Sequence, residues 1–258
     1  MSSILFEIRD QIAFITLNRP EKLNAFNREM ALLLQNRLDE CASLHEVRAV
    51  YLTGAGKGFS AGQDLAEVVD PQGPAMAQIL SEHYNPIITR IRHLPKPVVA
   101  AVRGIAAGAG ANIALCCDVV VASASASFIQ AFSKIGLIPD SGGTYFLPRL
   151  VGWQRASAIA MLGDKIVASE AERMGMVYKI YEDIDFDEAS KALTTTLARL
   201  PTQALAFTKH ALNYSSVNSF EAQLLLEDEL QQKASTTRDY KEGVQAFLNK
   251  RPANFTGE

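Results

Sequence analysis

The 258-residue sequence has no stretch of about 18 consecutive apolar residues, the length that a helix needs to cross a membrane, so no membrane span is expected. Its first ten residues lack the basic start and the apolar run of a signal peptide and are typical of a strand instead. Low-complexity runs are also absent. Apolar residues make up 48% of the chain and charged residues 21%, which argues against a disordered chain and allows a sizeable core.

An excess of one charge sign is missing as well. The net charge is −3, which gives no electrostatic reason to expect binding to nucleic acid or to an anionic membrane surface. Cysteine is scarce: Cys41 stands alone, and Cys116 and Cys117 are adjacent within an apolar run. An odd number of cysteines in such positions favours reduced core residues, so we expect a cytoplasmic protein.

The motifs of several enzyme classes do not occur. The glycines after the strand predicted over 47–53 lack the third glycine of the dinucleotide fingerprint, and no Gly-Lys-Ser/Thr sequence marks a nucleotide-binding P-loop. The Gly-x-Ser-x-Gly elbow of serine hydrolases is absent. The histidines are scattered without the spacing of metal ligands, so we expect neither a metal nor a bound cofactor. They are His45, His83, His93 and His210.

Strand and helix patterns alternate through the first part of the chain. Paired strands are predicted over Ile4–Arg9 and Ile12–Leu17, and further strands over 47–53, 97–102 and 119–122. Helices are predicted from Asn27, as the N-cap, to about Cys41, and then over 75–91 and 111–117. Such alternation indicates an α/β fold whose strands are buried on both faces.

From about residue 185 the pattern changes to helices alone. They are predicted over Phe186–Arg199, 203–213, 220–233 and 238–249, with Pro201 between the first two. We therefore divide the chain into an α/β core, residues 1–184, and a helical region, residues 185–258. A helical tail on an α/β body covers a site or forms a subunit interface, and the pattern favours neither.

Two glycine-rich turns carry the first indication of chemistry. They are Ala61-Gly62-Gln63, and the segment from Gly104 to Gly110 just before a predicted helix. Turns without side chains let a ligand approach the backbone, and the first N–H groups of a helix lack internal acceptors. Two N–H groups aimed at one oxygen would form an oxyanion hole. For one such turn alone, tight packing of a helix on a strand is the more ordinary explanation.

A single acid, Asp140, follows these turns in an apolar and glycine-rich segment from Gly136 to Gly143. A partly desolvated carboxylate has a raised pKa, which makes it a better base. The same aspartate could equally be the N-cap of a helix predicted over 143–150. An oxyanion hole needs a base beside it, and this favours the catalytic interpretation.

Together these residues resemble the crotonase superfamily, the enoyl-CoA hydratases and isomerases. The resemblance covers nearly the whole chain and includes Leu17 to Ala25, both glycine turns, Cys117-Asp118, Pro139 to Gly143 and Phe247 to Arg251. It implies a spiral of ββα units followed by a helical trimerisation region, and a CoA thioester as the substrate. It also implies a homotrimer or hexamer and admits a complex with a related hydratase.

The resemblance assigns roles to individual residues. It places the oxyanion donors at the N–H groups of Gln63 and Ala109, although the family more commonly has glycine at the second position. Asp140 stands where isomerases of the family carry their acid–base carboxylate. The positions that hold the nucleotide and pantetheine of CoA are Lys22, Leu23, Ala25, Ala61, Asp64 and Leu65. Phe247 and Lys250 match positions that often contact CoA, sometimes from a neighbouring subunit.

Two departures from the family pattern restrict the expected reaction. The two glutamates with which the hydratases activate water correspond here to Asn112 and Phe132, which would line the substrate pocket. Asparagine cannot take up a proton and phenylalanine excludes water, so hydration is not expected as the main reaction. Whether Asn112 orients the ligand or only packs is left open by the sequence.

One subgroup matches best. The segments from Phe128 to Thr144 and from Gly62 to Leu65, and the ending Asn254-Phe255-Thr256-Gly257, look like the isomerases of ring-1,2-epoxyphenylacetyl-CoA in phenylacetate breakdown. This implies a 1,3-proton shift through a thioester enolate, in which the ring epoxide opens to an oxepin. The alternative enzymes are a general 3-enoyl-CoA isomerase and an enoyl-CoA hydratase. The alternative of a different class is a non-catalytic acyl-CoA-binding partner subunit, against which Asp140 argues.

Overall fold

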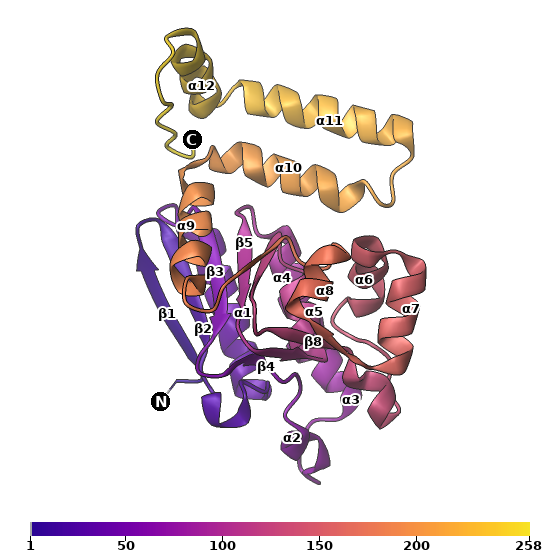
Figure 1. The fold of residues 1–258 in the computed structure, drawn as a ribbon. Helices are drawn as coiled ribbons and strands as arrows, with labels where there is room; N and C mark the ends of the chain where they lie inside the picture. Colours follow the sequence, from indigo (N-terminus) through magenta and orange to yellow (C-terminus); the bar gives the residue numbers. More distant parts are fainter. Residues whose placement is uncertain (1) are drawn as a thin grey trace.

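The computed structural model describes residues 2–258 and builds the first part of the chain around two sheets (Figure 1). The larger sheet has six strands in the order β1-β2-β3-β5-β7-β10. Their bounds are Ile4–Arg9 (β1), Ile12–Leu17 (β2), Ala49–Gly54 (β3), Val98–Val102 (β5), Val119–Ser123 (β7) and Lys179–Tyr181 (β10). β1 and β2 form the predicted antiparallel pair, and the later neighbours pair in parallel.

The smaller sheet consists of short strands in the order β4-β6-β8-β9. They are Gly58–Ser60 (β4), Ile105–Ala107 (β6), Ser127–Ile129 (β8) and Lys165–Val167 (β9). After β3, β5 and β7 the chain passes into β4, β6 and β8, so it winds as a repeated ββα unit. The prediction of a turn from Gly104 to Gly110 was therefore wrong in part. Residues 105–107 pair as β6 with β4 and β8, and this tertiary pairing overrides their weak local preference.

Helices fill the connections between the strands. α1 (Arg28–Ser43) begins at the predicted cap, where the side-chain oxygen of Asn27 accepts from the Met30 N–H at 3.0 Å. The helix predicted over 75–91 is three consecutive pieces, α3 (Met76–Gln78), a π-helical turn (Ile79–Tyr84) and α4 (Asn85–His93). The other helices of the body are α2 (Leu65–Val69), α5 (Ala109–Leu115), α6 (Gly143–Val151), α7 (Trp153–Leu162) and α8 (Ala168–Arg173), with 3₁₀ turns over Pro20–Lys22 and Ala131–Ile135.

The core explains the apolar runs of the sequence. Every residue of β5 is buried, as expected for a central strand covered on both faces. One large cluster of buried side chains joins the two sheets to the helices of the body. A second cluster, on the other face of the larger sheet, brings Tyr51 of β3 together with Phe186 and Ala198. The strands are thus fixed from both sides, and so are the turns that follow them.

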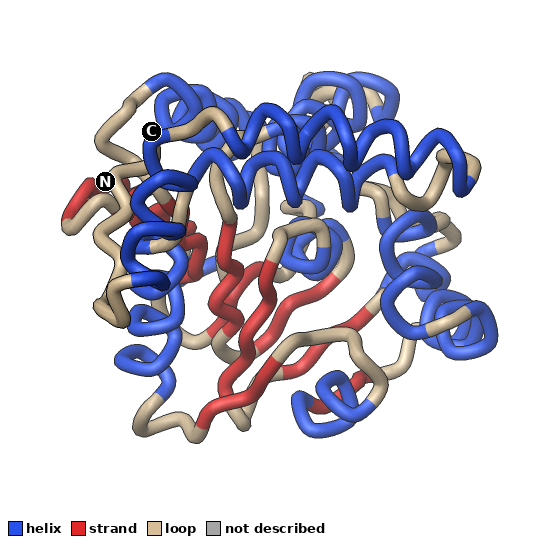
Figure 2. The backbone as a smooth tube through the Cα atoms, turned by 90° about the horizontal axis from the view of Figure 1, so that it is seen from above, coloured by secondary structure: helices blue, strands red, loops and turns tan. Residues whose placement is uncertain are grey.

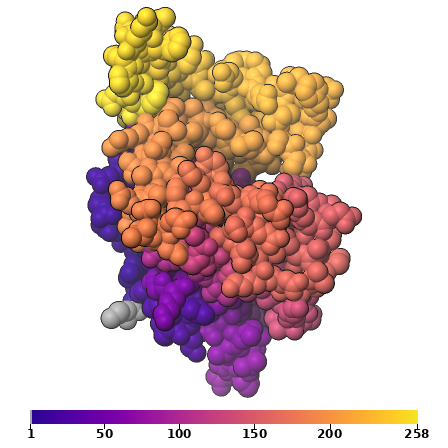
Figure 3. Space-filling view, in the orientation of Figure 1, coloured from indigo at the N-terminus to yellow at the C-terminus, as the bar shows by residue number. Residues whose placement is uncertain are grey.

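Four helices follow the last strand, close to their predicted ranges. They are α9 (Phe186–Arg199), α10 (Thr202–Tyr214), α11 (Phe220–Ser235) and α12 (Arg238–Leu248). α9 packs on the larger sheet through Phe186, whereas α10, α11 and α12 form the upper lobe of the molecule (Figures 1 and 3). Seen from above, α10 and α11 run side by side across the body (Figure 2). No helix within residues 2–258 is long and apolar enough to cross a membrane.

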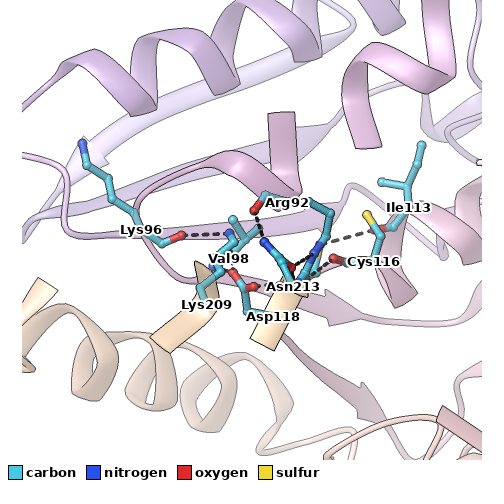
Figure 4. A network of polar contacts seen from close by, with 9 residues as sticks. Arg92, Lys96, Val98, Ile113, Cys116, Asp118, Lys209 and Asn213 are labelled. Atoms are coloured by element: carbon cyan, nitrogen blue, oxygen red, sulfur yellow. Dashed lines mark hydrogen bonds and ion pairs between the residues drawn. The ribbon is translucent and has the colours of Figure 1, made fainter. Parts of the chain in front are cut away.

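A buried ionic network fastens α10 to the body (Figure 4). The carboxylate of Asp118, just before β7, accepts from Lys209 Nζ at 2.7 Å, from Arg92 Nη1 at 3.1 Å and from the Val98 N–H at 2.8 Å. Lys209 lies in α10 and Arg92 in α4. One turn after Lys209, the side-chain amide of Asn213 donates to the main-chain oxygen of Arg92 at 2.9 Å. The network therefore links α10 to a helix and two strands of the body.

A second link joins the larger sheet to the end of the chain. Arg48, immediately before β3, is only 4% exposed. Its guanidinium donates to Thr202 Oγ1 at 2.9 Å, to the Leu200 oxygen at 2.7 Å and to the Phe255 oxygen at 2.7 Å. Arg48 thus holds two segments against the start of β3. One is the connection between α9 and α10, and the other is the C-terminal segment.

Candidate active site

The two glycine turns lie against each other because the strands before them are neighbours. β4 and β6 pair in parallel, so their carboxyl ends meet at the same edge of the smaller sheet. A Cβ atom placed on Gly62 would lie 2.8 Å from the carbonyl oxygen of Ala107 and 3.4 Å from the nitrogen of Ala109. Gly62 also has a φ of +90°. The close approach and the backbone angle both require glycine at this position.

The main chain on either side of Gln63 is fixed by Phe26. The Phe26 N–H donates to the Gly62 oxygen at 2.7 Å, and the Asp64 N–H donates to the Phe26 oxygen at 2.8 Å. In this strand-like pairing the N–H of Gln63 faces away from Phe26. None of the hydrogen bonds within residues 2–258 uses that N–H group. It is therefore available to an acceptor from outside the protein.

The start of α5 supplies a second free donor beside the first. The first internal hydrogen bond of α5 runs from the Asn112 N–H to the Gly108 oxygen at 3.1 Å, which leaves the Ala109 N–H without an acceptor in the helix. The ring of Phe132 covers the same turn: a Cβ atom on Gly108 would lie 3.7 Å from a ring carbon. Phe132 thus lies next to the turn, and its role as a pocket residue stays a prediction.

Asp140 is half-buried on the segment that precedes α6. Burial raises the pKa of the Asp140 carboxyl, and a hydrogen bond from Ser141 Oγ at 2.8 Å opposes that rise only in part. The alternative that Asp140 caps α6 is wrong. The N-cap is Gly142, and no side chain caps the helix. Ser141 and Gly142 both have positive φ, at 51° and 74°, and this turn places the carboxylate outside the cap.

Asn112 uses its whole side chain to hold the Asp140 segment. It is 1% exposed. Its Nδ2 donates to the main-chain oxygen of Asp140 at 2.8 Å, and its Oδ1 accepts from Gln130 Nε2 at 2.7 Å. A Cβ atom on Gly143 would collide with the Asn112 amide, so glycine at 143 makes room for this contact. The structure thus favours positioning over ligand binding for Asn112, a question that the sequence left open.

The residues predicted to hold CoA within one chain lie close to the first turn. Leu23 and Asn24 follow the 3₁₀ turn with positive φ, and the Ala61 N–H donates to the Leu23 oxygen at 2.9 Å. Asp64 forms an ion pair with Arg19, with 2.8 Å between Oδ2 and Nη2. The exposed apolar side chains in this region are Leu23 and Leu65, at 39% and 55%. The remaining members of the predicted set, Lys22 and Ala25, belong to the same loop.

Phe247 and Lys250 lie elsewhere. Phe247 lies near the end of α12 and Lys250 follows that helix, so both are in the upper lobe. α2 lies at the opposite end of the molecule (Figure 1). Phe247 is 83% exposed. A single chain therefore does not bring these two residues to the other predicted CoA positions.

Two residues near the site were missed by sequence reasoning. Tyr84 and Glu67 both bond to the side chain of Gln63, and Asp140 and Glu67 each raise the pKa of Tyr84 through their charge, after the larger effect of burial. Asp140 is thus not the only carboxylate near the glycine turns. Glu67 could have been noticed, because it stands four residues after Gln63 at helical spacing. Tyr84 comes from a distant helix and belongs to no motif.

An apolar cavity of about 400 Å³ adjoins the Asp140 segment. It lies between that segment and α7, and its walls include Leu137, Ile138, Pro139, Trp153 and Met161. Within residues 2–258, no three His, Cys, Asp or Glu side chains are grouped so that they could hold a metal ion.

Comparisons with known proteins match this chain over nearly its whole length. The family model described as enoyl-CoA hydratase/isomerase matches residues 7–258. The 1,2-epoxyphenylacetyl-CoA isomerase of Escherichia coli K12 is 45% identical over 261 residues, covering 100% of both chains. A probable enoyl-CoA hydratase of Rhodobacter capsulatus is 46% identical over 259 residues, covering 99% of this chain and 98% of the relative.

Solved structures agree in fold. A crystal structure of an enoyl-CoA hydratase/isomerase family protein from Mycobacterium abscessus superimposes with a TM-score of 0.92 at 35% identity, covering 99% of this chain and 100% of that one. The resemblance inferred from the sequence is confirmed, and so is the predicted architecture of ββα units followed by helices. On the evidence of a family model that spans nearly the whole chain and of relatives matched from end to end, the chain belongs to the enoyl-CoA hydratase/isomerase family, the crotonases.

Proposed function

We propose that this protein is an acyl-CoA isomerase that moves a double bond by a 1,3-proton shift through a thioester enolate. One observation carries the proposal. The half-buried Asp140 is tethered to the helix that begins at one of two free N–H groups, while Asn112 and Phe132 occupy the positions of the water-activating glutamates. The site therefore has an acid–base group for carbon but lacks the pair that adds water.

The proposed mechanism needs one carboxylate and two donors. The thioester oxygen accepts hydrogen bonds from the N–H groups of Gln63 and Ala109, and negative charge moving onto this oxygen acidifies the α-proton. Asp140 takes up that proton, and the electron pair of the C–H bond becomes the double bond of the enolate. The same carboxyl then returns the proton to the carbon two bonds further along the conjugated system. The proton is conserved and no water is consumed.

The substrate that we propose is 1,2-epoxyphenylacetyl-CoA, whose ring epoxide opens to an oxepin as the double bonds relocate. The full-length similarity to the Escherichia coli isomerase of that substrate supports this choice. The apolar cavity beside Pro139 supports a hydrocarbon acyl group. Lys22, Leu23, Ala25, Ala61, Asp64 and Leu65 would hold the CoA. An enzyme with this substrate would act in phenylacetate breakdown.

Enoyl-CoA hydration is the second candidate, because the Rhodobacter capsulatus relative of equal similarity is named a hydratase. One assay separates the two. The purified protein is supplied with 1,2-epoxyphenylacetyl-CoA, with a 3-enoyl-CoA and with a 2-enoyl-CoA, and loss of substrate and incorporation of solvent deuterium are followed. Isomerisation of either of the first two, with little hydration of the third, supports the proposal. Hydration that is faster than both isomerisations would refute it.

We also propose that copies of the chain associate through the upper lobe, as a trimer or a pair of trimers. α11 and α12 expose large apolar side chains that a monomer would leave in water. They include Phe220, Leu225, Phe247 and Leu248. Association would allow Phe247 and Lys250 to reach the CoA of a neighbouring copy, and light scattering measures the mass directly. The free buried thiols of Cys41, Cys116 and Cys117 fit a reducing compartment such as the cytoplasm.

A further inference from the structure

The side chain of Gln63 is held at both ends, although the proposed reaction uses only its main-chain N–H. Its Oε1 accepts from the hydroxyl of Tyr84 at 2.7 Å, and its Nε2 donates to Glu67 Oε2 at 2.8 Å. An amide offers an acceptor at one end and donors at the other, and here each end meets a matching partner. The orientation of the amide is therefore determined by its two neighbours.

Glu67 is itself anchored at the start of α1. Its Oε1 accepts from the N–H of Arg28, the first residue of that helix, at 2.8 Å. This N–H has no acceptor inside the helix and lies at the positive end of the helix dipole, where a carboxylate is favoured. Glu67 therefore cannot follow a movement of the Gln63 amide without losing this bond.

Tyr84 reaches Gln63 from the π-helical turn over Ile79–Tyr84, of which it is the last residue. Turns of this kind are rare and occur frequently at functional sites. The Gln35 side chain donates to the Glu82 oxygen at 2.6 Å and to the His83 oxygen at 3.1 Å, so carbonyls of the widened turn have partners. The turn is thus supported by α1, and it places Tyr84 at 0% exposure.

The Tyr84 hydroxyl is the donor in its hydrogen bond to Gln63. Burial raises the pKa of Tyr84 well above its ordinary value, and the charges of Asp140 and Glu67 raise it further. The phenol therefore keeps its proton at neutral pH, and this proton points to the Gln63 oxygen.

Tyr84 also contacts the residue that fixes the main chain of Gln63. Its ring packs edge-on against Phe26, with 6.0 Å between centroids and an interplanar angle of 67°. Phe26 is the residue whose backbone bonds to Gly62 and Asp64 on either side of Gln63. Tyr84 thus acts on Gln63 through its side chain and, by way of Phe26, through its backbone.

We propose that Tyr84 is a positioning residue for the oxyanion donor: through the side-chain amide of Gln63, its hydroxyl acts together with the backbone bonds of Phe26 to hold the direction of the Gln63 N–H. The proposal rests on the proposed function. A rotation of the Gln63 peptide moves the N–H away from the thioester oxygen, and a misplacement of about 1 Å at a reacting centre can lower the rate about a hundredfold. Tyr84 touches no substrate in this scheme, and it acts only through Gln63.

Tyr84→Phe tests the proposal, because it removes the hydroxyl and keeps the ring against Phe26. We expect kcat for isomerisation to fall about tenfold or more, with KM changed less than about twofold. The infrared band of the bound thioester carbonyl should shift less from its free frequency than in the wild type. Binding of a CoA thioether that lacks the carbonyl should be unchanged. Tyr51→Phe is the matched control, since Tyr51 is also buried and bonds to Ser190 Oγ at 2.9 Å away from the site.

A wild-type kcat together with a wild-type carbonyl frequency in Tyr84→Phe would overturn the proposal. So would equal losses in Tyr84→Phe and Tyr51→Phe, because these would show a general effect of removing a buried hydroxyl. Absence of double-bond migration by the wild-type protein on both the epoxide and the 3-enoyl-CoA would instead refute the proposed function, and the carbonyl band would still report on Tyr84.

Gln63→Met provides a second variant if Tyr84→Phe folds poorly. It keeps the main-chain N–H and removes both side-chain hydrogen bonds, so the same loss of kcat and the same smaller carbonyl shift are expected. The double variant should be no worse than Gln63→Met alone, because Tyr84 then has no amide to act through. Additive losses in the double variant would contradict the proposed route.

Discussion

The side-chain amide of Asn112 donates to the main-chain oxygen of Asp140 at 2.8 Å, so the helix that begins at the second glycine turn is tied to the segment that carries the carboxylate. The free N–H of Ala109 and the base proposed for the α-proton are thereby parts of one packed unit. A change at Asn112 should disturb chemistry even where the coenzyme still binds.

Asn112→Ala tests that coupling. The substitution removes the bond to Asp140 and leaves Gln130 Nε2 without its acceptor. We expect kcat to fall about tenfold or more through misplacement of the carboxylate, with little change in KM. Steady-state kinetics on the isomerisation substrate measure both values. An unchanged kcat would show that Asp140 holds its position without Asn112.

Asp140→Asn should nearly abolish isomerisation. Acid–base groups of this kind contribute about 10²- to 10⁴-fold, and no other group is proposed to hold the proton. Binding of CoA should remain close to the wild-type value, because Asp140 lies outside the residues predicted to contact the coenzyme. Titration calorimetry with CoA and an assay of isomerisation check the two parts. If most of the turnover survived, the assignment of the base would be wrong.

The pH dependence of kcat/KM should reflect the raised pKa of Asp140. The carboxyl must be deprotonated to act as a base, so activity falls as the pH drops through its pKa. Burial raises that pKa, and the acid limb should therefore lie above the value of about 3.9 found for an ordinary aspartate. A rate profile over acidic pH measures the midpoint. An acid limb at or below the ordinary value would contradict the burial of the reacting group.

The same shift predicts an effect on stability with a definite sign. A carboxyl whose pKa is higher in the folded state favours folding when it is protonated, and this contribution is lost as the pH rises through the folded pKa. At neutral pH the charged Asp140 therefore opposes folding. Asp140→Asn should leave Tm at pH 7 unchanged or higher, whereas at low pH the difference should shrink. Thermal melts at both pH values provide the test, and a lower Tm at pH 7 would go against it.

Asp118→Asn should destabilise the protein. It removes the charge that compensates the buried ammonium of Lys209 and the guanidinium of Arg92 (Figure 4). Breaking a buried pair on one side costs about 3–5 kcal/mol, and we expect a value near the lower end because asparagine still accepts one hydrogen bond. Urea unfolding at fixed protein concentration measures the change. As a control, Glu229→Gln breaks the exposed pair with Lys233 and should leave the urea midpoint nearly unchanged.

The longer elements could be predicted because their sequence patterns are strong. Asn27 marks the start of α1 by its capping side chain, and β5 is apolar at every position because both of its faces are buried. The short strands could not be predicted in the same way. β4 and β6 have three residues each, some of them glycine or alanine, and they are strands because they pair with each other and because β6 also pairs with β8.

The candidate site likewise contains residues that stand out in the sequence and residues that do not. Gly62 and Asp140 could be found from sequence, since glycine at a close approach and a lone acid among apolar residues both stand out. Tyr84 could not, because its role depends on a π-helical turn that has no motif and on a contact across 21 residues with Gln63. The contact between Asn112 and Asp140 could not be predicted for a similar reason, because it joins a helix to a turn 28 residues further along the chain.

The three bonds of Arg48 also bear on the order in which the chain can fold. Arg48 lies immediately before β3. The residues that carry its acceptors, Leu200, Thr202 and Phe255, are synthesised about 150 to 200 residues later. A buried charge without partners is costly, so burial of Arg48 in its native place requires acceptors from residues 200–255. Native packing at the start of a central strand is thereby coupled to the presence of the C-terminal segment.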